Sequence, residues 1–63
     1  MQTAAPVKVI VADDHKLFAD GVEQIINSTP GFEVIANVNN GKLLMQTLNR
    51  LSPDIILLDI NGY

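Results

Sequence analysis

The chain contains no cysteine among its 63 residues. Disulfides therefore cannot brace a domain of this size, which buries only about 60% of its unfolded surface on folding. The lack of cysteine fits a reducing compartment, and we expect a cytoplasmic protein. Basic residues are also scarce, with 4 Lys+Arg against 7 Asp+Glu and a net charge of -3. We expect no nucleic-acid binding by this segment, because such binding depends on clustered basic side chains.

Long apolar runs are missing as well. No run approaches the ~18 residues needed to cross a bilayer, so we expect no membrane segment. Residues 1–6 lack the basic start and apolar core of a signal peptide and are expected to form a flexible tail. Hydrophobic residues make up 48% of the chain, which predicts one small folded domain over residues 7–63.

Short apolar runs alternate with amphipathic segments along the chain. Strands are expected at 7–12, 32–37 and 55–58, because these runs are short, rich in β-branched residues and bounded by turn signals. The uniformly apolar third run predicts a strand buried on both faces. Helices are expected from about residue 15 to the turn at 27–31, and from 41 to about 51. The expected apolar stripes are Leu17, Phe18, Val22, Ile25 and Ile26 in the first helix, and Leu43, Leu44, Thr47, Leu48 and Leu51 in the second.

Local signals predict how these helices begin and end. Asp14 is expected to cap the first helix, and Asn39 or Asn40 the second. Gly21 inside the first helix predicts close approach to a neighbouring element, because glycine otherwise costs about 0.5–1 kcal/mol there. Arg50 is expected in the last turn of the second helix, where the macrodipole favours a cation. The order β-α-β-α-β predicts an α/β fold with parallel strands and right-handed crossovers.

Carboxylates follow the first and third apolar runs directly. Asp13 and Asp14 end the first run, and Asp59 ends the third. Ligands bind beyond the carboxyl ends of strands in open parallel sheets, so these acids are expected to share one crevice. Three close carboxylates repel, and a bound cation such as Mg²⁺ would relieve that repulsion. A carboxylate beside Mg²⁺ can also attack phosphorus and form an aspartyl-phosphate.

A plainer interpretation of the same acids stays open. Loops are polar, so Asp14 could be a helix cap and Asp59 a turn residue. His15 lies next to the acids, and we expect an exposed residue at the start of the helix rather than a metal ligand.

Several short motifs occur in the order and at the spacing typical of one known family. They are VIVADDH at 9–15, Leu17-Phe18, Gly21, Asn40-Gly41 and SPDIILLDI at 52–60. Together they resemble the first part of the receiver domains of two-component response regulators, over residues 7 to about 61. The Asp-Asp-His form is similar to the NarL/FixJ-like subfamily, whose members carry a C-terminal helix-turn-helix.

The resemblance implies specific roles for four residues. Asp59 would be the phosphoacceptor, with a histidine kinase as phosphodonor. Asp13 and Asp14, together with Asp59, would hold Mg²⁺, and Asn61 would supply a backbone carbonyl to the metal. The implied fold is a doubly wound, flavodoxin-like parallel sheet, of which residues 7–63 supply three of five strands. This partial receiver domain would not itself be an enzyme, and its parent would be a DNA-binding transcriptional regulator.

The chain also departs from the family pattern. Relatives usually continue through a Met-Pro turn after the acceptor strand, so Asn61 is either the residue two past the acceptor or belongs beyond a missing loop. Residues 1–63 offer no counterpart to the hydroxyl residue and lysine that follow the fourth and fifth strands. The third strand would expose an apolar edge, which predicts self-association, swapping of elements, or a complementing C-terminal half.

Two other functions remain open on the sequence. The chain could be a structural half-domain or engineered fragment that associates through its open sheet edge without signalling activity. It could also be a small metal-dependent phosphatase on a similar sheet. Against the phosphatase, no second acid stands two residues after Asp59, where Asn61 is found.

Overall fold

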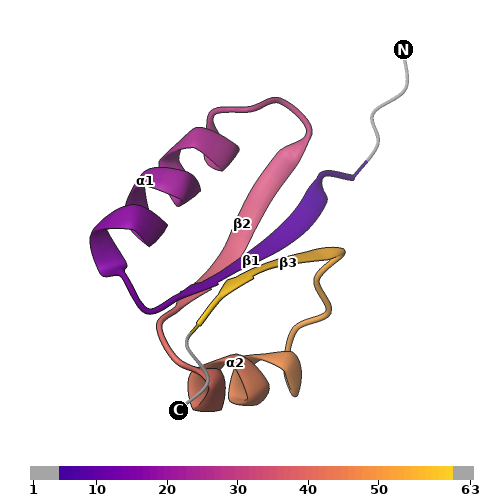
Figure 1. The fold of residues 1–63 in the computed structure, drawn as a ribbon. Helices are drawn as coiled ribbons and strands as arrows, with labels where there is room; N and C mark the ends of the chain where they lie inside the picture. The colour runs from indigo at the N-terminus through magenta and orange to yellow at the C-terminus, as the bar shows by residue number, and fades with distance from the viewer. Residues whose placement is uncertain (1–4, 61–63) are drawn as a thin grey trace.

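The structure, a computed structural model, describes residues 5–60 of the chain. Its elements are β1 (Val7–Asp13), α1 (Lys16–Asn27), β2 (Phe32–Val38), α2 (Gly41–Leu48) and β3 (Ile55–Asp59). They form a single parallel sheet in the order β2-β1-β3 (Figure 1). The predicted α/β fold with a β-α-β-α-β order is thus confirmed. No helix within residues 5–60 is long and apolar enough to cross a membrane.

Strand β1 is the centre of the sheet. It pairs on one edge with β2 and on the other with β3, and residues 9–13 are all buried. The register pairs Ile10 with Ile56 and, at the carboxyl end, Asp13 with Asp59. A strand with two paired edges and two covered faces needs apolar residues at consecutive positions, which explains the unbroken apolar run in β1.

The two helices cover opposite faces of the sheet (Figure 1). Ile10 and Ala12 of β1 pack with Val38 and Leu44 on the face covered by α2. The alternate residues of β1 pack with Ala19 on the face covered by α1. Because the chain passes from β1 to β2 and then back across β1 to β3, its switch point lies between β1 and β3, where open α/β sheets bind ligands.

The predicted apolar stripe of α1 is only partly buried. Leu17, Phe18 and Ile25 are 89%, 62% and 69% exposed, so the expected apolar stripe is not buried at these positions. The helix instead uses Ala19, with Val22 and Ile26 packed beside it. The helix lies over β1 and β2. It does not cover β3, which lies on the other edge of β1.

The second helix is shorter than predicted, and its stripe is also incomplete. It ends at Leu48, where the N–H groups of Arg50 and Leu51 both donate to the Thr47 carbonyl, at 2.9 and 2.8 Å. This tight turn places Arg50 outside the helix, so its predicted position in the last turn is wrong. Leu43 is 41% exposed, and Leu44 and Thr47 are the buried residues of this helix.

The glycines differ in what they contribute. A Cβ at Gly21 would meet no atom within 4 Å, so the predicted close approach of α1 to a neighbour at this position is wrong. Gly31 has φ +90°, a conformation that residues with a side chain rarely adopt. Its carbonyl accepts the Val7 N–H at 2.8 Å, which ties the turn before β2 to the start of β1.

Strand β3 is exposed rather than buried. Ile55, Ile56, Leu57 and Leu58 are 41%, 38%, 41% and 64% exposed. The strand pairs only with β1, and within residues 5–60 neither helix packs extensively against it. The predicted burial on both faces is therefore wrong for this chain, whereas the predicted exposed apolar edge is found.

Candidate functional site

The two acids that end strands lie side by side. Asp13 is the last residue of β1, Asp59 is the last residue of β3, and they are partners in the parallel register. Neighbouring strands lie about 4.8 Å apart, so the two backbones present their side chains at one end of the sheet. Asp13 is 3% exposed, whereas Asp59 is exposed to solvent. The predicted meeting of these acids at a shared strand end is thus found.

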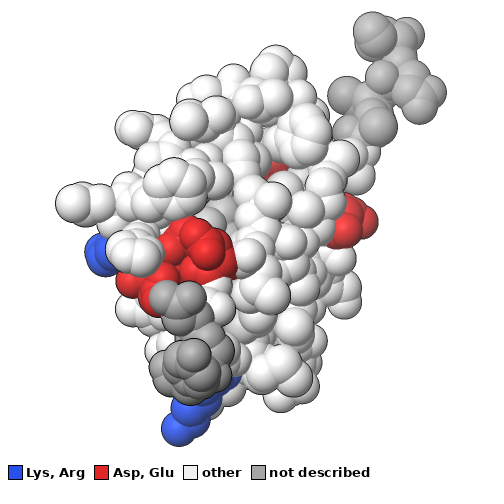
Figure 2. Space-filling view, in the orientation of Figure 1, with Lys and Arg blue, Asp and Glu red and all other residues white. Residues whose placement is uncertain are grey.

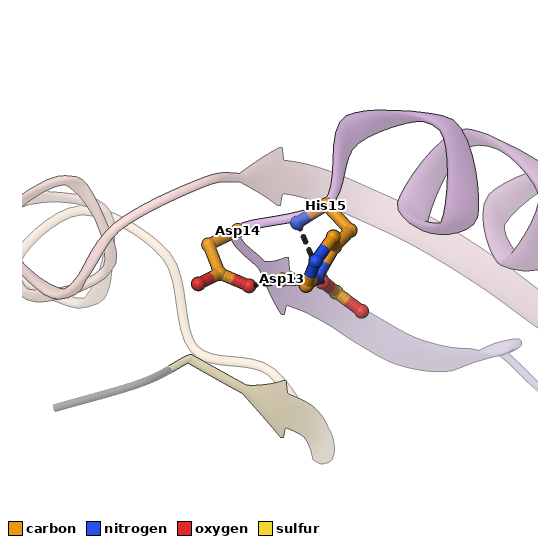
Figure 3. Close-up of side chains that lie close together, drawn as sticks. All are labelled: Asp13, Asp14 and His15. Atoms are coloured by element: carbon orange, nitrogen blue, oxygen red, sulfur yellow. Dashed lines mark hydrogen bonds and ion pairs between the residues drawn. The ribbon is translucent and has the colours of Figure 1, made fainter.

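Asp13 is held in place by the turn that follows β1. Its Oδ1 accepts the backbone N–H of His15 at 2.8 Å (Figure 3). The bond spans two residues, the pattern by which an aspartate closes a turn on its own backbone. Because the side chain is nearly buried and hydrogen-bonded, its carboxylate has a defined position before any ligand arrives.

Asp14 does not cap α1 as predicted. The N-cap position belongs to His15, which makes no side-chain capping bond. The Asp14 carboxylate instead points toward the His15 ring, with Oδ1 3.1 Å from Nδ1 (Figure 3). The cap is lost because the turn closed by Asp13 starts the helix one residue later than the sequence suggests. In contrast, one of the two residues predicted to cap α2 does so: Asn40 is the N-cap, and its Oδ1 accepts the Leu43 N–H at 2.8 Å.

One group of metal-ligating atoms stands out within residues 5–60. One ligand atom each from Asp13, Asp14 and His15 lie within 4.8 Å of one another. His15 Nδ1 is also 3.7 Å from Asp13 Oδ1. The side chain of His15 is 74% exposed, as expected, but its ring nitrogen lies among the acids. Its position directly after Asp13 and Asp14 was the sequence feature that could have indicated this proximity.

Asp59 borders this group without joining it. It lines a groove of about 300 Å³ with Asp13, Phe18 and Leu58, between α1 and β3. The groove opens where α1 leaves β3 uncovered, so a ligand can reach the Asp59 carboxylate from solvent. The fourth predicted site residue, Asn61, lies outside the described residues.

Within the described residues, the acids have no lysine or arginine partner. Across residues 5–60, no lysine or arginine nitrogen lies within 4.0 Å of Asp13, Asp14 or Asp59. The space-filling view shows acidic side chains gathered at this end of the molecule (Figure 2). A buried carboxylate needs a compensating charge or several hydrogen bonds, and Asp13 has one hydrogen bond from its neighbour's backbone. Oxygen donors open to water on one side fit a Mg²⁺ ion, which takes one or two carboxylates and keeps several waters.

The chain is similar in sequence to known regulatory proteins. The chain is 43% identical over 61 residues to the nitrate/nitrite response regulator protein NarP of Escherichia coli K12, covering 97% of this chain and 28% of NarP. It is 38% identical over 55 residues to the transcriptional regulatory protein DegU of Brevibacillus brevis, covering 87% of this chain and 23% of DegU. The chain thus spans about a quarter of the length of these relatives. No solved structure matches it.

A third relative carries a different activity in its name. The chain is 46% identical over 54 residues to a protein-glutamate methylesterase/protein-glutamine glutaminase of Photobacterium profundum, covering 86% of this chain and 14% of that protein. Regulators and an enzyme therefore share this segment. The family model for the response regulator receiver domain matches residues 9–61. The chain belongs to the response regulator receiver domain family, and its resemblance to the NarL/FixJ-like type is confirmed.

Proposed function

We propose that this chain accepts a phosphoryl group on Asp59, with Mg²⁺ held at the acid pocket. The observation that carries the proposal is the register of β1 with β3, which makes Asp13 and Asp59 partners at the switch point of the sheet. An exposed carboxylate beside a buried one suits two roles, a nucleophile that reaches substrate and a fixed anchor for a cation. Membership of the receiver family supports the same assignment.

The proposed transfer starts from a phosphohistidine on a histidine kinase. A carboxylate oxygen of Asp59 attacks phosphorus as the bond between phosphorus and the kinase imidazole breaks. The imidazole leaves and takes a proton from solvent, and the product is an aspartyl-phosphate. Because Asp59 is exposed to solvent, the donor can reach it without movement of the sheet.

The metal ligands in this proposal are the carboxylates of Asp13, Asp14 and Asp59 and the backbone carbonyl of Asn61. When bound, Mg²⁺ supplies charge neutralisation for a phosphoryl group that approaches an anionic pocket. The hydrogen bond from the His15 N–H holds Asp13 ready for this role. The Asp14 carboxylate lies beside it and is open to solvent, so the exposed side of the pocket can keep metal-bound waters.

Beryllofluoride, which mimics a bound phosphoryl group, tests the proposal. Backbone NMR spectra of the chain are recorded with Mg²⁺ alone and with Mg²⁺ plus beryllofluoride. We expect shifts at the ends of β1 and β3 that need both reagents and vanish in Asp59→Asn. Shifts that persist in Asp59→Asn, or that do not depend on Mg²⁺, contradict the assignment.

A second candidate function is assembly through the edge of β3. Four consecutive large apolar residues are each at least 38% exposed there, and an unpaired apolar strand promotes association. The partner is a second copy of this chain or a complementing C-terminal half of the receiver domain. In this role the chain would be a structural half-domain, and its acids would carry no signal.

Two matched lysine substitutions test the assembly. Leu58 on β3 is 64% exposed and Met45 on α2 is 63% exposed, so neither change buries a charge in the chain itself. By sedimentation, we expect the unaltered chain and Met45→Lys to associate with rising concentration, and Leu58→Lys to stay monomeric. A monomer that unfolds cooperatively at all concentrations contradicts the assembly.

The larger context follows from the relatives. We further propose that the parent protein is a cytoplasmic DNA-binding transcriptional regulator of the NarL/FixJ-like type. DegU, to which the chain is similar, is by name a transcriptional regulatory protein. Residues 7–63 would be part of the parent's receiver domain, with no enzymatic activity in this segment. DNA binding would belong to an effector domain, because this segment carries few basic residues. The test is whether the parent protein retards DNA whereas this chain does not.

A further inference from the structure

We infer that the Asp13–Asp14–His15 group is a second, competing metal site that takes a borderline divalent ion such as Zn²⁺. The ligands are one oxygen each from Asp13 and Asp14 and the Nδ1 atom of His15. The inference shares two acids with the proposed Mg²⁺ pocket and does not use Asp59. Zn²⁺ bound in this way would occupy the acids that phosphorylation needs, so it would act as an inhibitor.

The positions of the ligand atoms support this site. His15 Nδ1 is 3.1 Å from Asp14 Oδ1 and 3.7 Å from Asp13 Oδ1. Two atoms bound to one Zn²⁺ at about 2.0–2.2 Å each lie no more than about 4.4 Å apart. Both measured distances meet this limit, and the group as a whole spans at most 4.8 Å. Only small side-chain movements would therefore bring three ligands onto one ion.

The buried carboxylate supplies a separate argument for a cation. Asp13 is 3% exposed, and within residues 5–60 the ring of His15 is the sole basic group within ion-pair distance of it. Its hydrogen bond from the His15 backbone uses one lone pair of Oδ1 and leaves the carboxylate able to bind metal. A metal ion that bridges the two residues compensates the charge of Asp13.

Ligand chemistry decides which ion gains from His15. Mg²⁺ prefers oxygen ligands, whereas imidazole favours Zn²⁺, Cu²⁺ and Ni²⁺. The third ligand therefore raises affinity for Zn²⁺ selectively and leaves that for Mg²⁺ nearly unchanged. Three protein ligands with an exposed ring leave a fourth position for water, the arrangement of an open zinc site.

The test compares Zn²⁺ and Mg²⁺ binding to the full 63-residue chain by titration calorimetry. We expect His15→Ala to weaken Zn²⁺ binding at least tenfold and to change Mg²⁺ binding less than twofold. Gln24→Ala, an exposed position on α1, is the matched control and should alter neither. Circular dichroism confirms that each variant is folded. Equal losses for the two ions, or no loss for Zn²⁺, overturn the inference.

Two further readouts separate this site from the proposed phosphoacceptor function. The chain has a single histidine, so its ring signals in NMR report on His15 alone, and one equivalent of Zn²⁺ should shift them. Asp59→Asn should leave Zn²⁺ binding intact, and Asp13→Asn should weaken it. A failure of Mg²⁺-dependent phosphorylation with intact Zn²⁺ binding would defeat the proposed function alone. Ring signals unaffected by Zn²⁺ would defeat the zinc site alone.

Discussion

Replacing isoleucine by valine at two paired positions tests the distribution of buried surface in the sheet. Ile10 of β1 is 0% exposed and packs in the core, whereas its register partner Ile56 of β3 is 38% exposed. Both substitutions remove one methylene and keep a β-branched side chain, so strand propensity barely changes. The difference between the two variants therefore reports on burial alone.

The expected magnitudes differ clearly. Ile10→Val should lower the free energy of unfolding by about 0.5–1.5 kcal/mol, and Ile56→Val by less than about 0.5 kcal/mol. A 63-residue domain is expected to have about 3–9 kcal/mol in total, so the first loss is measurable without unfolding the chain. With a urea slope near 1 kcal/mol per molar, the midpoint should fall by about 0.5–1.5 M for Ile10→Val.

The assay is urea unfolding followed by circular dichroism at low micromolar concentration. Equal losses at the two positions would refute the exposure of β3, because Ile56 would then be buried in solution. A loss at Ile56 that grows with protein concentration would identify a second copy of the chain as the covering partner.

Four other substitutions follow from local structure. Gly21→Ala should stabilise the chain by about 0.5–1 kcal/mol, because the added Cβ meets no atom within 4 Å. Gly31→Ala should destabilise it by about 1–2 kcal/mol, because Gly31 has φ +90°. Thermal unfolding of the two variants checks the sign of each change. Asn40→Ala should cost about 0.5–2 kcal/mol through loss of the α2 cap, and a loss no larger than that of Asn39→Ala in the same denaturant assay would contradict the capping bond. Asp13→Asn should raise the melting temperature in Mg²⁺-free buffer, because repulsion from Asp14 is relieved while the His15 N–H keeps its acceptor. Added Mg²⁺ should raise the melting temperature of the unaltered chain only, and an equal rise in Asp13→Asn would refute the metal role.

The order of elements could be predicted because each depends on local pattern. The apolar run ending at Asp13, the helical spacing from Leu17 to Ile26 and the Asn40 cap each depend on residues that are close together in the sequence. The pairing of Asp13 with Asp59 was also predictable, because parallel strands separated by helices bring their carboxyl ends to one edge of the sheet.

The errors arise where a residue's role depends on what lies across from it. Leu57 and Phe18 are apolar enough for a core, but no described element covers the space between α1 and β3. Asp14 has the right residue type for a cap, but the turn closed by Asp13 moves the helix start. A glycine inside a helix suggests close contact with another element, but no neighbouring atom lies within 4 Å of a Cβ placed at Gly21. Spacing alone shows none of these relations.

Phosphorylation of Asp59 can be tested by locating the phosphoryl group itself. The chain is incubated with a small acyl phosphate and Mg²⁺, reduced with borohydride to trap any aspartyl-phosphate, and mapped by peptide mass. The proposed role of Asp59 predicts that this residue is modified, and that the modification is lost without Mg²⁺ and in Asp59→Asn. Modification at Asp13 or Asp14 instead, or none at Asp59 in the folded chain with Mg²⁺ present, would contradict it.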